Sequence, residues 1–318
     1  MSASGQRPGR TWSWLRWCLL SAVVGGLCLV FVLAGQLSVP DRRLPGSTPG
    51  DLDVEFTAVT LQTRDGLSLA AWAVEPVGPV LGAVLLFHGK DGCRSPGRLA
   101  AVAKAGLAGL SLDHRGHGGS DGERTGFGWF ERFDVEAAVK EARERWGDVP
   151  LIGWGTSQGA AALVYAVDPR DGVLAANTFS GLLLESLYVE IETAFDQRIE
   201  LSLGGWAVPF AGAVMTLAAW RGDLSGLELS PRGALQRAVA GGLSAEHVLL
   251  ASGGEDHHAT PLELQQLAEV VPGCVVELLP GLGHVDLWSR GTASWRETVL
   301  AFFRRVTGSD SGPSDPPR

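Results

Sequence analysis

The sequence predicts an α/β domain built on a mainly parallel sheet. Short apolar runs alternate along the chain with segments whose apolar residues recur at three- and four-residue spacing, the pattern of strands followed by helices. The runs are apolar almost throughout, as expected of strands covered on both faces. Strands are expected at residues 83–87, 107–112, 150–154, 173–177, 247–252 and 274–279, and helices at 97–106, 130–146, 159–167 and 261–271.

An apolar segment precedes this domain. Residues 17–40 carry no charge over 24 positions, which is long enough for a transmembrane helix. We expect a cytoplasmic leader at 1–16 and an anchor at 17–39, although Val32, Leu33 and Ala34 also suit a signal-peptide cleavage site. Three arginines before the segment, against two after it, favour a cytoplasmic N-terminus and an exported domain.

The domain itself is expected over residues 52–306. A Pro- and Gly-rich stretch at 40–51 predicts a linker, and two alternating segments, 54–63 and 67–76, flank turn residues and predict a hairpin. The polar, Pro-rich residues 307–318 predict a disordered tail. A chain of 318 residues with 45% hydrophobic content can bury a sizeable core, and its net charge of -9 gives no basic footprint for nucleic acid.

Two stretches match the G-x-S-x-G pattern of a nucleophile elbow, one around Ser157 and one around Ser120. The elbow requires a strand before the serine, a helix after it and small neighbours. Ser157 meets these conditions, because the run PLIGW leads into it and GAAALVYAV follows. Ser120 lies instead in the polar loop HRGHGGSDGERTGFG, which favours a loop serine. We therefore predict Ser157 as the nucleophile.

A serine nucleophile also needs a base and an orienting acid. Asp256 follows the run at 247–252, and His284 follows the run at 274–279. Each of the three residues comes just beyond the carboxyl end of an expected strand, where sites of parallel sheets assemble. Glu255 is the neighbouring alternative for the acid.

The stretches HGKDG, DHRGHGGSDG, GWGTSQGA, ASGGEDHHATP and GLGHVDLW together resemble the motif set of the α/β-hydrolase superfamily, in particular its serine esterase, monoacylglycerol lipase and aminopeptidase-like branch. The resemblance covers about residues 52–306. It implies the α/β-hydrolase fold, a mainly parallel eight-stranded sheet with helices on both faces and a short helical lid insertion. It also implies Ser157 as nucleophile, Asp256 as acid, His284 as base, and an oxyanion hole from the backbone N–H groups of Gln158 and Lys90. Lys90-Asp91-Gly92 departs from the apolar or glycine-rich residues usual after His-Gly, so Asp91 is an alternative to Lys90.

The helical pattern at about 180–240 is too long for a simple connection and predicts the lid. Its stretch Leu201–Trp220 is uncharged, but a membrane crossing there would separate Ser157 from Asp256 and His284. It is therefore expected to be an apolar lid over an acyl pocket, or else a pair of ordinary packed helices.

The function expected is a membrane-anchored, single-pass serine hydrolase of the cell membrane that cleaves carboxylic esters, including acylglycerol or lipid-like ones, through an acyl-enzyme. A peptidase or acyltransferase on the same triad and a non-catalytic binding protein are the alternatives. The expected partners are a small-molecule acyl substrate and the membrane, with no nucleic acid, no cofactor and no metal. Cys93 and Cys274 are placed on opposite rims of the sheet, so no disulfide is expected between them.

Overall fold

The computed structural model describes residues 11–205, 211–221, 224 and 227–308. Residues 1–10 of the expected leader and 309–318 of the expected tail lie outside the described residues, as do 206–210 within the apolar stretch of the insertion.

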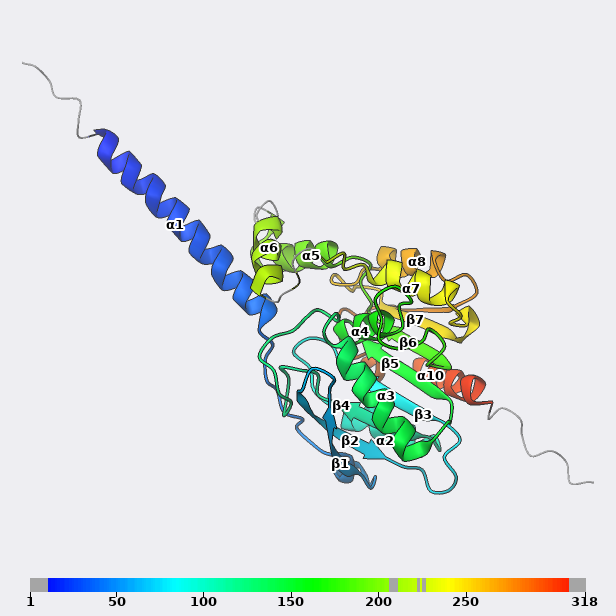
Figure 1. Cartoon of the computed structure of the whole chain (residues 1–318). Coiled ribbons are helices and arrows are strands. Elements are labelled where there is room, and N and C mark those ends of the chain that lie inside the picture. The colour runs from blue at the N-terminus through cyan, green and yellow to red at the C-terminus, as the bar shows by residue number, and fades with distance from the viewer. Residues whose placement is uncertain (1–10, 206–210, 222–223, 225–226, 309–318) are drawn as a thin grey trace, which may run out of the picture.

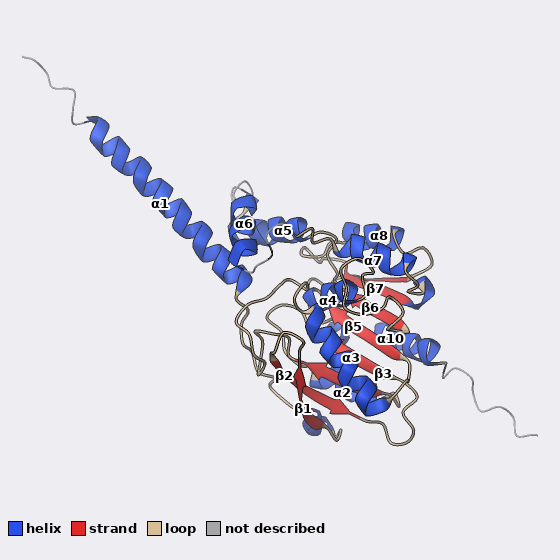
Figure 2. Cartoon of the chain, in the orientation of Figure 1, coloured by secondary structure: helices blue, strands red, loops and turns tan. Residues whose placement is uncertain are grey.

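Eight strands form one sheet in the order β1-β2-β4-β3-β5-β6-β7-β8 (Figures 1 and 2). The hairpin strands β1 and β2 pair antiparallel, and β2 also pairs antiparallel with β4, whereas all later pairs are parallel. The strands are β1 (Thr57–Gln62), β2 (Ser68–Val74), β3 (Ala83–Phe87), β4 (Ala108–Leu112), β5 (Leu151–Thr156), β6 (Gly181–Glu185), β7 (Val248–Gly253) and β8 (Val275–Leu279). The eight-stranded, mainly parallel sheet is thus confirmed.

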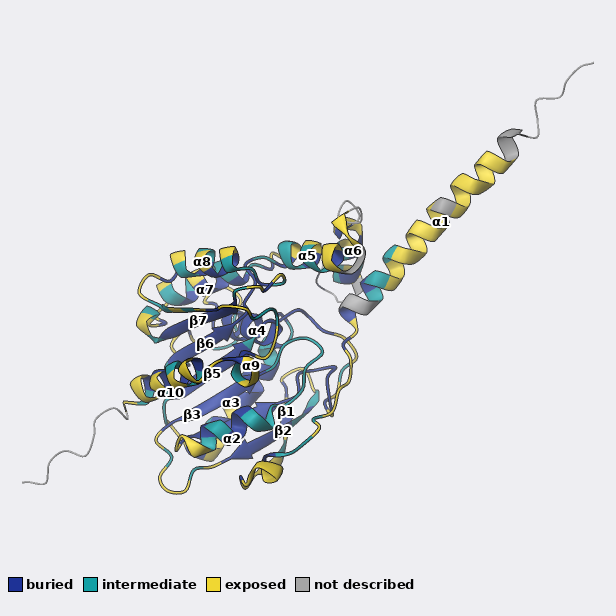
Figure 3. Cartoon of the chain, turned by 180° about the vertical axis from the view of Figure 1, so that it is seen from behind, coloured by how far each residue is buried: buried dark blue, intermediate teal, exposed yellow. Residues whose placement is uncertain are grey.

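Helices cover both faces of the sheet. The described helices are α1 (Thr11–Ser38), α2 (Pro96–Lys104), α3 (Arg132–Trp146), α4 (Gln158–Ala166), α5 (Ile191–Leu203), α6 (Ala211–Arg221), α7 (Pro231–Ala240), α8 (Pro261–Glu269), α9 (Leu287–Arg290) and α10 (Ala293–Thr307), with short 3-10 turns at Pro49–Leu52 and Ala245–His247. Buried side chains of α3, α4, α7 and α8 pack on one face, and those of α2, α9 and α10 on the other. Figure 3 shows the second face.

The continuous apolar runs have a direct structural cause. In β3, Leu85 and Phe87 belong to the core on the α3 and α4 side, while Val84 and Leu86 belong to the core on the α2 and α10 side. Successive strand residues point to opposite faces, so a strand buried on both faces needs an apolar residue at every position.

One expected strand is wrong. Residues 173–177 form turns, and the sixth strand is β6, at Gly181–Glu185. The backbone N–H groups of Val173 and Leu174 donate to the carbonyl oxygen of Ala166 at the end of α4, each at 2.9 Å, so this apolar run closes a helix end. The strand residues GLLLE are fully buried. The helical insertion consequently begins after β6.

The insertion contributes α5, α6 and α7. Helix α7 packs against α4 on the body of the domain, whereas α6 lies beside the C-terminal end of α1 (Figures 1 and 3). Helix α1 projects from the domain with most of its apolar side chains exposed (Figure 3). Within it, Trp14–Gly35 spans 22 residues with a mean hydropathy of 2.5, enough in length and composition to cross a membrane, a test that a signal sequence also passes.

The segment after α1 runs along the domain. The Ser38 carbonyl oxygen accepts a hydrogen bond from the Thr125 N–H at 3.0 Å, and the Asp41 N–H donates to the Asp91 carboxylate at 2.9 Å. The start of the expected linker at 40–51 is therefore hydrogen-bonded to loops beyond the carboxyl ends of the central strands.

Candidate active site

Ser157 occupies a sharp turn between β5 and α4. Its backbone angles are φ 51° and ψ -113°, a conformation that a residue with a side chain adopts only under constraint from its surroundings. The Ser157 N–H donates to the Glu185 carbonyl oxygen at 2.7 Å, which fixes the turn to β6.

Small residues allow this turn. A Cβ atom at Gly159 would lie 2.2 Å from the Phe87 carbonyl oxygen, and one at Gly155 would lie 2.6 Å from the Ala160 Cα. Helix α4 therefore starts in direct contact with the ends of β3 and β5. This close approach explains the glycines that flank the serine at two residues on each side.

His284 and Asp256 are brought together from the loops after β8 and β7. The His284 Nδ1 lies 2.8 Å from Asp256 Oδ2 and 3.1 Å from Oδ1. The carboxylate also accepts hydrogen bonds from Ser186 Oγ at 2.9 Å and from the backbone N–H groups of His258 and Ala259 at 2.8 and 2.9 Å.

These contacts determine the charge of Asp256. Burial alone would raise the pKa of its carboxyl group, but the hydrogen bond and charge of His284, together with the two backbone N–H groups, outweigh burial and lower the pKa. Asp256 is therefore ionised at neutral pH and fixes a proton on the Nδ1 of His284, which leaves the other ring nitrogen free to accept one.

Ser157 and His284 line the same cavity, of about 530 Å³, beyond the carboxyl ends of the central strands. The loop after β3 forms another wall, with Lys90 and Asp91. A second, narrow cavity of about 20 Å³ is lined by Ser157, Gln158 and Lys90 among others. Of the five residues expected to act in catalysis, Ser157, His284, Gln158 and Lys90 thus line these two cavities, and Asp256 is hydrogen-bonded to His284.

The loop after β3 approaches the nucleophile closely. A Cβ atom at Gly89 would lie 3.3 Å from the Ser157 Cβ. Asp91 has φ 62°, its N–H donates to His117 Nε2 at 3.2 Å, and its carboxylate accepts from the Lys90 ammonium at 2.9 Å. The N–H of Asp91 is therefore engaged, which favours Lys90 over Asp91 as the second oxyanion donor.

Comparison with known proteins agrees with this architecture. A family model described as serine aminopeptidase, S33, matches residues 78–217. The α/β hydrolase domain-containing protein WAV2 of Arabidopsis thaliana is 25% identical over 300 residues, which cover 89% of this chain and 91% of that protein. The chain therefore has the α/β-hydrolase fold.

Two further comparisons extend over much of the chain. The uncharacterized protein YqkD of Bacillus subtilis (strain 168) is 26% identical over 208 residues, 63% of each chain. The crystal structure of the Pyrococcus furiosus esterase Pf2001 superposes with a TM-score of 0.66 at 20% identity and covers 85% of this chain and 98% of that one. At this identity the likeness to the esterase concerns the fold alone.

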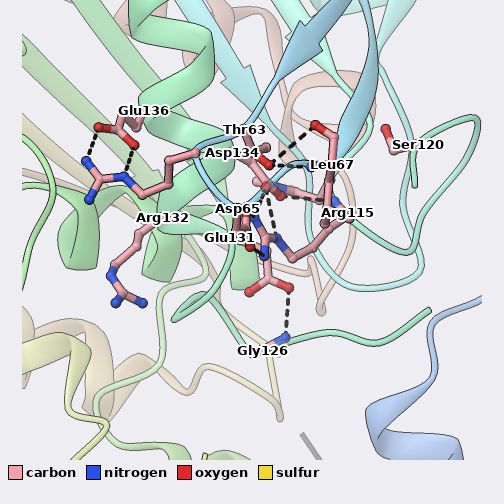
Figure 4. A network of polar contacts seen from close by, with 12 residues as sticks. Thr63, Asp65, Leu67, Arg115, Ser120, Gly126, Glu131, Arg132, Asp134 and Glu136 are labelled. Carbon is pink, nitrogen blue, oxygen red and sulfur yellow. Dashed lines mark hydrogen bonds and ion pairs between the residues drawn. The ribbon is translucent and has the colours of Figure 1, made fainter. Parts of the chain in front are cut away.

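Ser120, the second pattern match, has a structural environment in this fold. Its hydroxyl donates to the Asp113 carbonyl oxygen at 2.6 Å and accepts from the Ala70 N–H at 3.0 Å. Figure 4 shows it beside the network in which Arg115 binds Asp134 and Asp65. The loop DHRGHGGSDG thus ties β4 to α3 and to the hairpin, and Ser120 does not line the cavity around Ser157.

Arg98 of α2 holds the rim on the other side of the site. Its guanidinium donates to Glu185 Oε2 at 2.7 Å and to Asp286 Oδ1 at 2.6 Å, and lies 4.4 Å from the ring centre of Trp154. Glu185 ends β6, and Asp286 lies two residues beyond His284. This buried ion pair therefore fixes the loop that carries His284.

No role is predicted from the sequence for two residues that line the cavity, His258 and Arg198. His258 packs edge-on against His284, with ring centres 5.0 Å apart, and burial together with the charges of His284 and Arg198 lowers its pKa to about 4. Arg198 reaches the cavity from α5 of the insertion. His258 follows β7 at the same strand end as Asp256. No spacing relative to the strands marks Arg198, because only the folding of the insertion over the sheet brings Arg198 near Ser157.

Proposed function

We propose that the chain is a membrane-anchored serine hydrolase that cleaves carboxylic esters. The observation that carries the proposal is the strained turn at Ser157, which opens into the same cavity as His284 while His284 is hydrogen-bonded to an ionised Asp256. The fold shared with an esterase supports this choice of substrate.

In the proposed mechanism, His284 takes the proton of the Ser157 hydroxyl as that oxygen attacks the ester carbonyl. Asp256 holds the Nδ1 proton of His284 and stabilises the imidazolium that forms. His284 then gives the proton to the departing alcohol. Water hydrolyses the acyl-enzyme by the same sequence of proton transfers and restores Ser157.

The backbone N–H groups of Gln158 and Lys90 are assigned to the oxyanion. Gln158 is the first residue of α4, so its N–H has no partner inside the helix and lies at the positive end of the helix dipole. Amides held in place before the reaction stabilise the negative charge that develops on the carbonyl oxygen.

The membrane part of the proposal is supported by α1 and by the position of α6 beside its C-terminal end. We assign α1 as a single-pass anchor with the domain on the exported side, and α5 and α6 as a lid over the acyl pocket. A cleaved signal peptide is the alternative for α1, and detection of the N-terminal residues in the mature protein distinguishes the two.

Peptide hydrolysis is the second candidate, favoured by the description of the matching family model as serine aminopeptidase. An aminopeptidase binds a positively charged amino terminus. The cavity around Ser157 is lined by more cations than carboxylates, which disfavours such a ligand. We therefore place esters first; acyl transfer and non-catalytic binding lack a supporting contact.

Labelling of the full chain with a fluorophosphonate probe tests the nucleophile. We expect labelling of the wild type and of Ser120→Ala, and none of Ser157→Ala. Turnover of ester, thioester and amide substrates of several acyl lengths then identifies the reaction. Labelling that survives in Ser157→Ala contradicts the proposal, and absence of both labelling and turnover in folded wild type supports a binding protein instead.

A further inference from the structure

Two cavities of different chemistry meet at Ser157. The larger, of about 530 Å³, is lined by many charged residues and by His284. The narrow one, of about 20 Å³, is lined by Phe127, Tyr188 and Phe195 among others and does not include His284. Ser157, Lys90, Arg198 and His258 line both cavities.

The narrow cavity leads towards an apolar one. A third cavity, of about 220 Å³, shares Phe127, Ile191 and Phe195 with it and is otherwise lined mainly by apolar side chains of the insertion, such as Met215 and Leu224. It lies under α5 and α6, and the second of these helices contacts the end of α1. The apolar side chains on this side of Ser157 match the chemistry of an acyl chain attached to the reacting carbonyl.

The direction of proton transfer indicates which cavity holds the departing alcohol. In the proposed mechanism His284 gives its proton to the departing alcohol, so that alcohol must lie next to His284. His284 lines the larger cavity and not the narrow one. The acyl group is therefore expected in the narrow cavity and the alcohol in the larger one.

Among the described residues that line the larger cavity, one cation has no ion-pair partner. Its charged lining residues are Arg43, Lys90, Arg94, Arg98 and Arg198 on the positive side, and Asp91 and Asp286 on the negative side. Four of the cations form ion pairs: Arg43 with Asp41, Lys90 with Asp91, Arg94 with Asp113, and Arg98 with Glu185 and Asp286.

Arg198 differs from these four. Within the described ranges no carboxylate lies within ion-pair distance of its guanidinium, and Asp91, which acts on it through space, is already bound by the Lys90 ammonium and the Asp41 N–H. Burial lowers the pKa of Arg198, the sign of a cation that is desolvated without full compensation. An anion supplied by a ligand offsets that cost.

We propose that the substrate is an amphipathic ester whose departing alcohol carries an anionic group, a carboxylate or a phosphate, and that Arg198 is the specificity-determining residue that binds this anion. The inference rests on the proposed ester hydrolysis at Ser157. The apolar cavities take the acyl chain, and Arg198, at the junction of the cavities, selects the charge of the other half.

Two pairs of substrates with a decanoyl chain test the proposal. The first pair is 4-carboxyphenyl decanoate and its neutral isostere 4-carbamoylphenyl decanoate. The second is decanoylglycerol 3-phosphate and monodecanoylglycerol, which distinguishes phosphate from carboxylate. For each pair, the ratio of kcat/KM for the anionic ester to that for the neutral ester is measured in the full-length wild type and in Arg198→Gln. The comparison between proteins cancels the intrinsic difference in leaving ability.

We expect Arg198→Gln to lower this ratio by about 10- to 100-fold for at least one pair, through the anionic substrate, because a hydrogen bond to a charged group is lost. Arg198→Lys is expected to restore part of the ratio. Arg290→Gln is the charge-matched control, since Arg290 of α9 is exposed and lines neither cavity.

The outcomes separate the two proposals. Ser157-dependent turnover of the neutral esters with a ratio unchanged in Arg198→Gln overturns the role of Arg198 and leaves ester hydrolysis intact. Turnover that persists in Ser157→Ala, or no turnover of any ester by folded wild type, overturns ester hydrolysis itself. If Arg198→Gln lowers the ratio for only one substrate pair, that pair identifies the anion: a carboxylate for the phenyl esters, a phosphate for the glycerol esters.

Discussion

Replacement of Asp256 by asparagine exchanges one carboxylate oxygen for an amide nitrogen. The hydrogen bonds around Asp256 determine which of the two positions the nitrogen takes. Asp256 Oδ1 accepts from the backbone N–H groups of His258 and Ala259, and neither group can turn away. The asparagine oxygen must therefore occupy this position. Its amide nitrogen then occupies the position of Oδ2, opposite Ser186 Oγ and the Nδ1 of His284.

That nitrogen is a donor, so the variant reverses one hydrogen bond. The Ser186 hydroxyl can rotate and accept. His284 can accept at Nδ1 only by moving its proton to the other nitrogen, and this tautomer cannot take the proton of Ser157. We expect kcat to fall by about 10³- to 10⁴-fold, which corresponds to about 4–5.5 kcal/mol of activation free energy. The free energy of unfolding should change by only about 1–2 kcal/mol, the contribution of one charge-assisted hydrogen bond.

The assay is steady-state hydrolysis of a decanoyl ester by Asp256→Asn, with urea unfolding of the same preparation. Glu255→Gln is the matched control, since Glu255 is the exposed neighbour in sequence. Retention of kcat within tenfold in Asp256→Asn refutes the reasoning. A large loss in Glu255→Gln instead assigns the acid to Glu255.

Three other substitutions have definite expected outcomes. Gly159→Ala places a Cβ 2.2 Å from a carbonyl oxygen of β3 and should cost at least about 3 kcal/mol in urea unfolding, whereas Gly97→Ala, whose Cβ meets nothing within 4 Å, should cost little. Arg98→Met leaves the fully buried Glu185 carboxylate without its cation and should lower the free energy of unfolding by about 3–5 kcal/mol in urea unfolding. A double variant that also removes the charge of Glu185 should lose less. The pKa of His258 is lowered to about 4, so as the pH falls the unfolded chain binds a proton at this histidine before the folded chain does, and stability decreases from about pH 6.5 towards pH 4. Because His258 is partly exposed to solvent, which screens the effect, we expect it to account for about 1 kcal/mol of this decrease. His258→Gln should remove that contribution, as measured by the melting temperature at each pH.

Much of the fold follows from local patterns in the sequence. A strand buried on both faces requires apolar residues at consecutive positions, and this requirement marks β3, β4, β5 and β7 to within two residues of their ends. The edge strand β8 is apolar in the same way, although its Val276 and Leu278 are exposed. The strand β6 escaped prediction because two apolar runs, at 173–177 and 181–185, follow one another closely. Only pairing with β5 and β7 distinguishes the strand from the run that closes α4.

The candidate site divides in the same way. The elbow at Ser157 has a local sequence pattern, although Gly155 is required by contact with α4 and Gly159 by contact with the end of β3. Asp256 and His284 follow from their places after strands of one parallel sheet. The hydrogen bond from Asp41 to Asp91 and the entry of Arg198 into the cavity join segments distant in sequence.

The architecture and the three residues at the centre of the proposed chemistry can therefore be inferred from sequence, because both depend on periodicity and on position relative to strand ends. The surroundings of that centre are known only from the folded chain: that Arg198 has no ion-pair partner among the described residues, which cavity contains His284, and which helices cover the acyl side. Those properties depend on which side chains meet across the fold, and a one-dimensional pattern contains no record of such contacts.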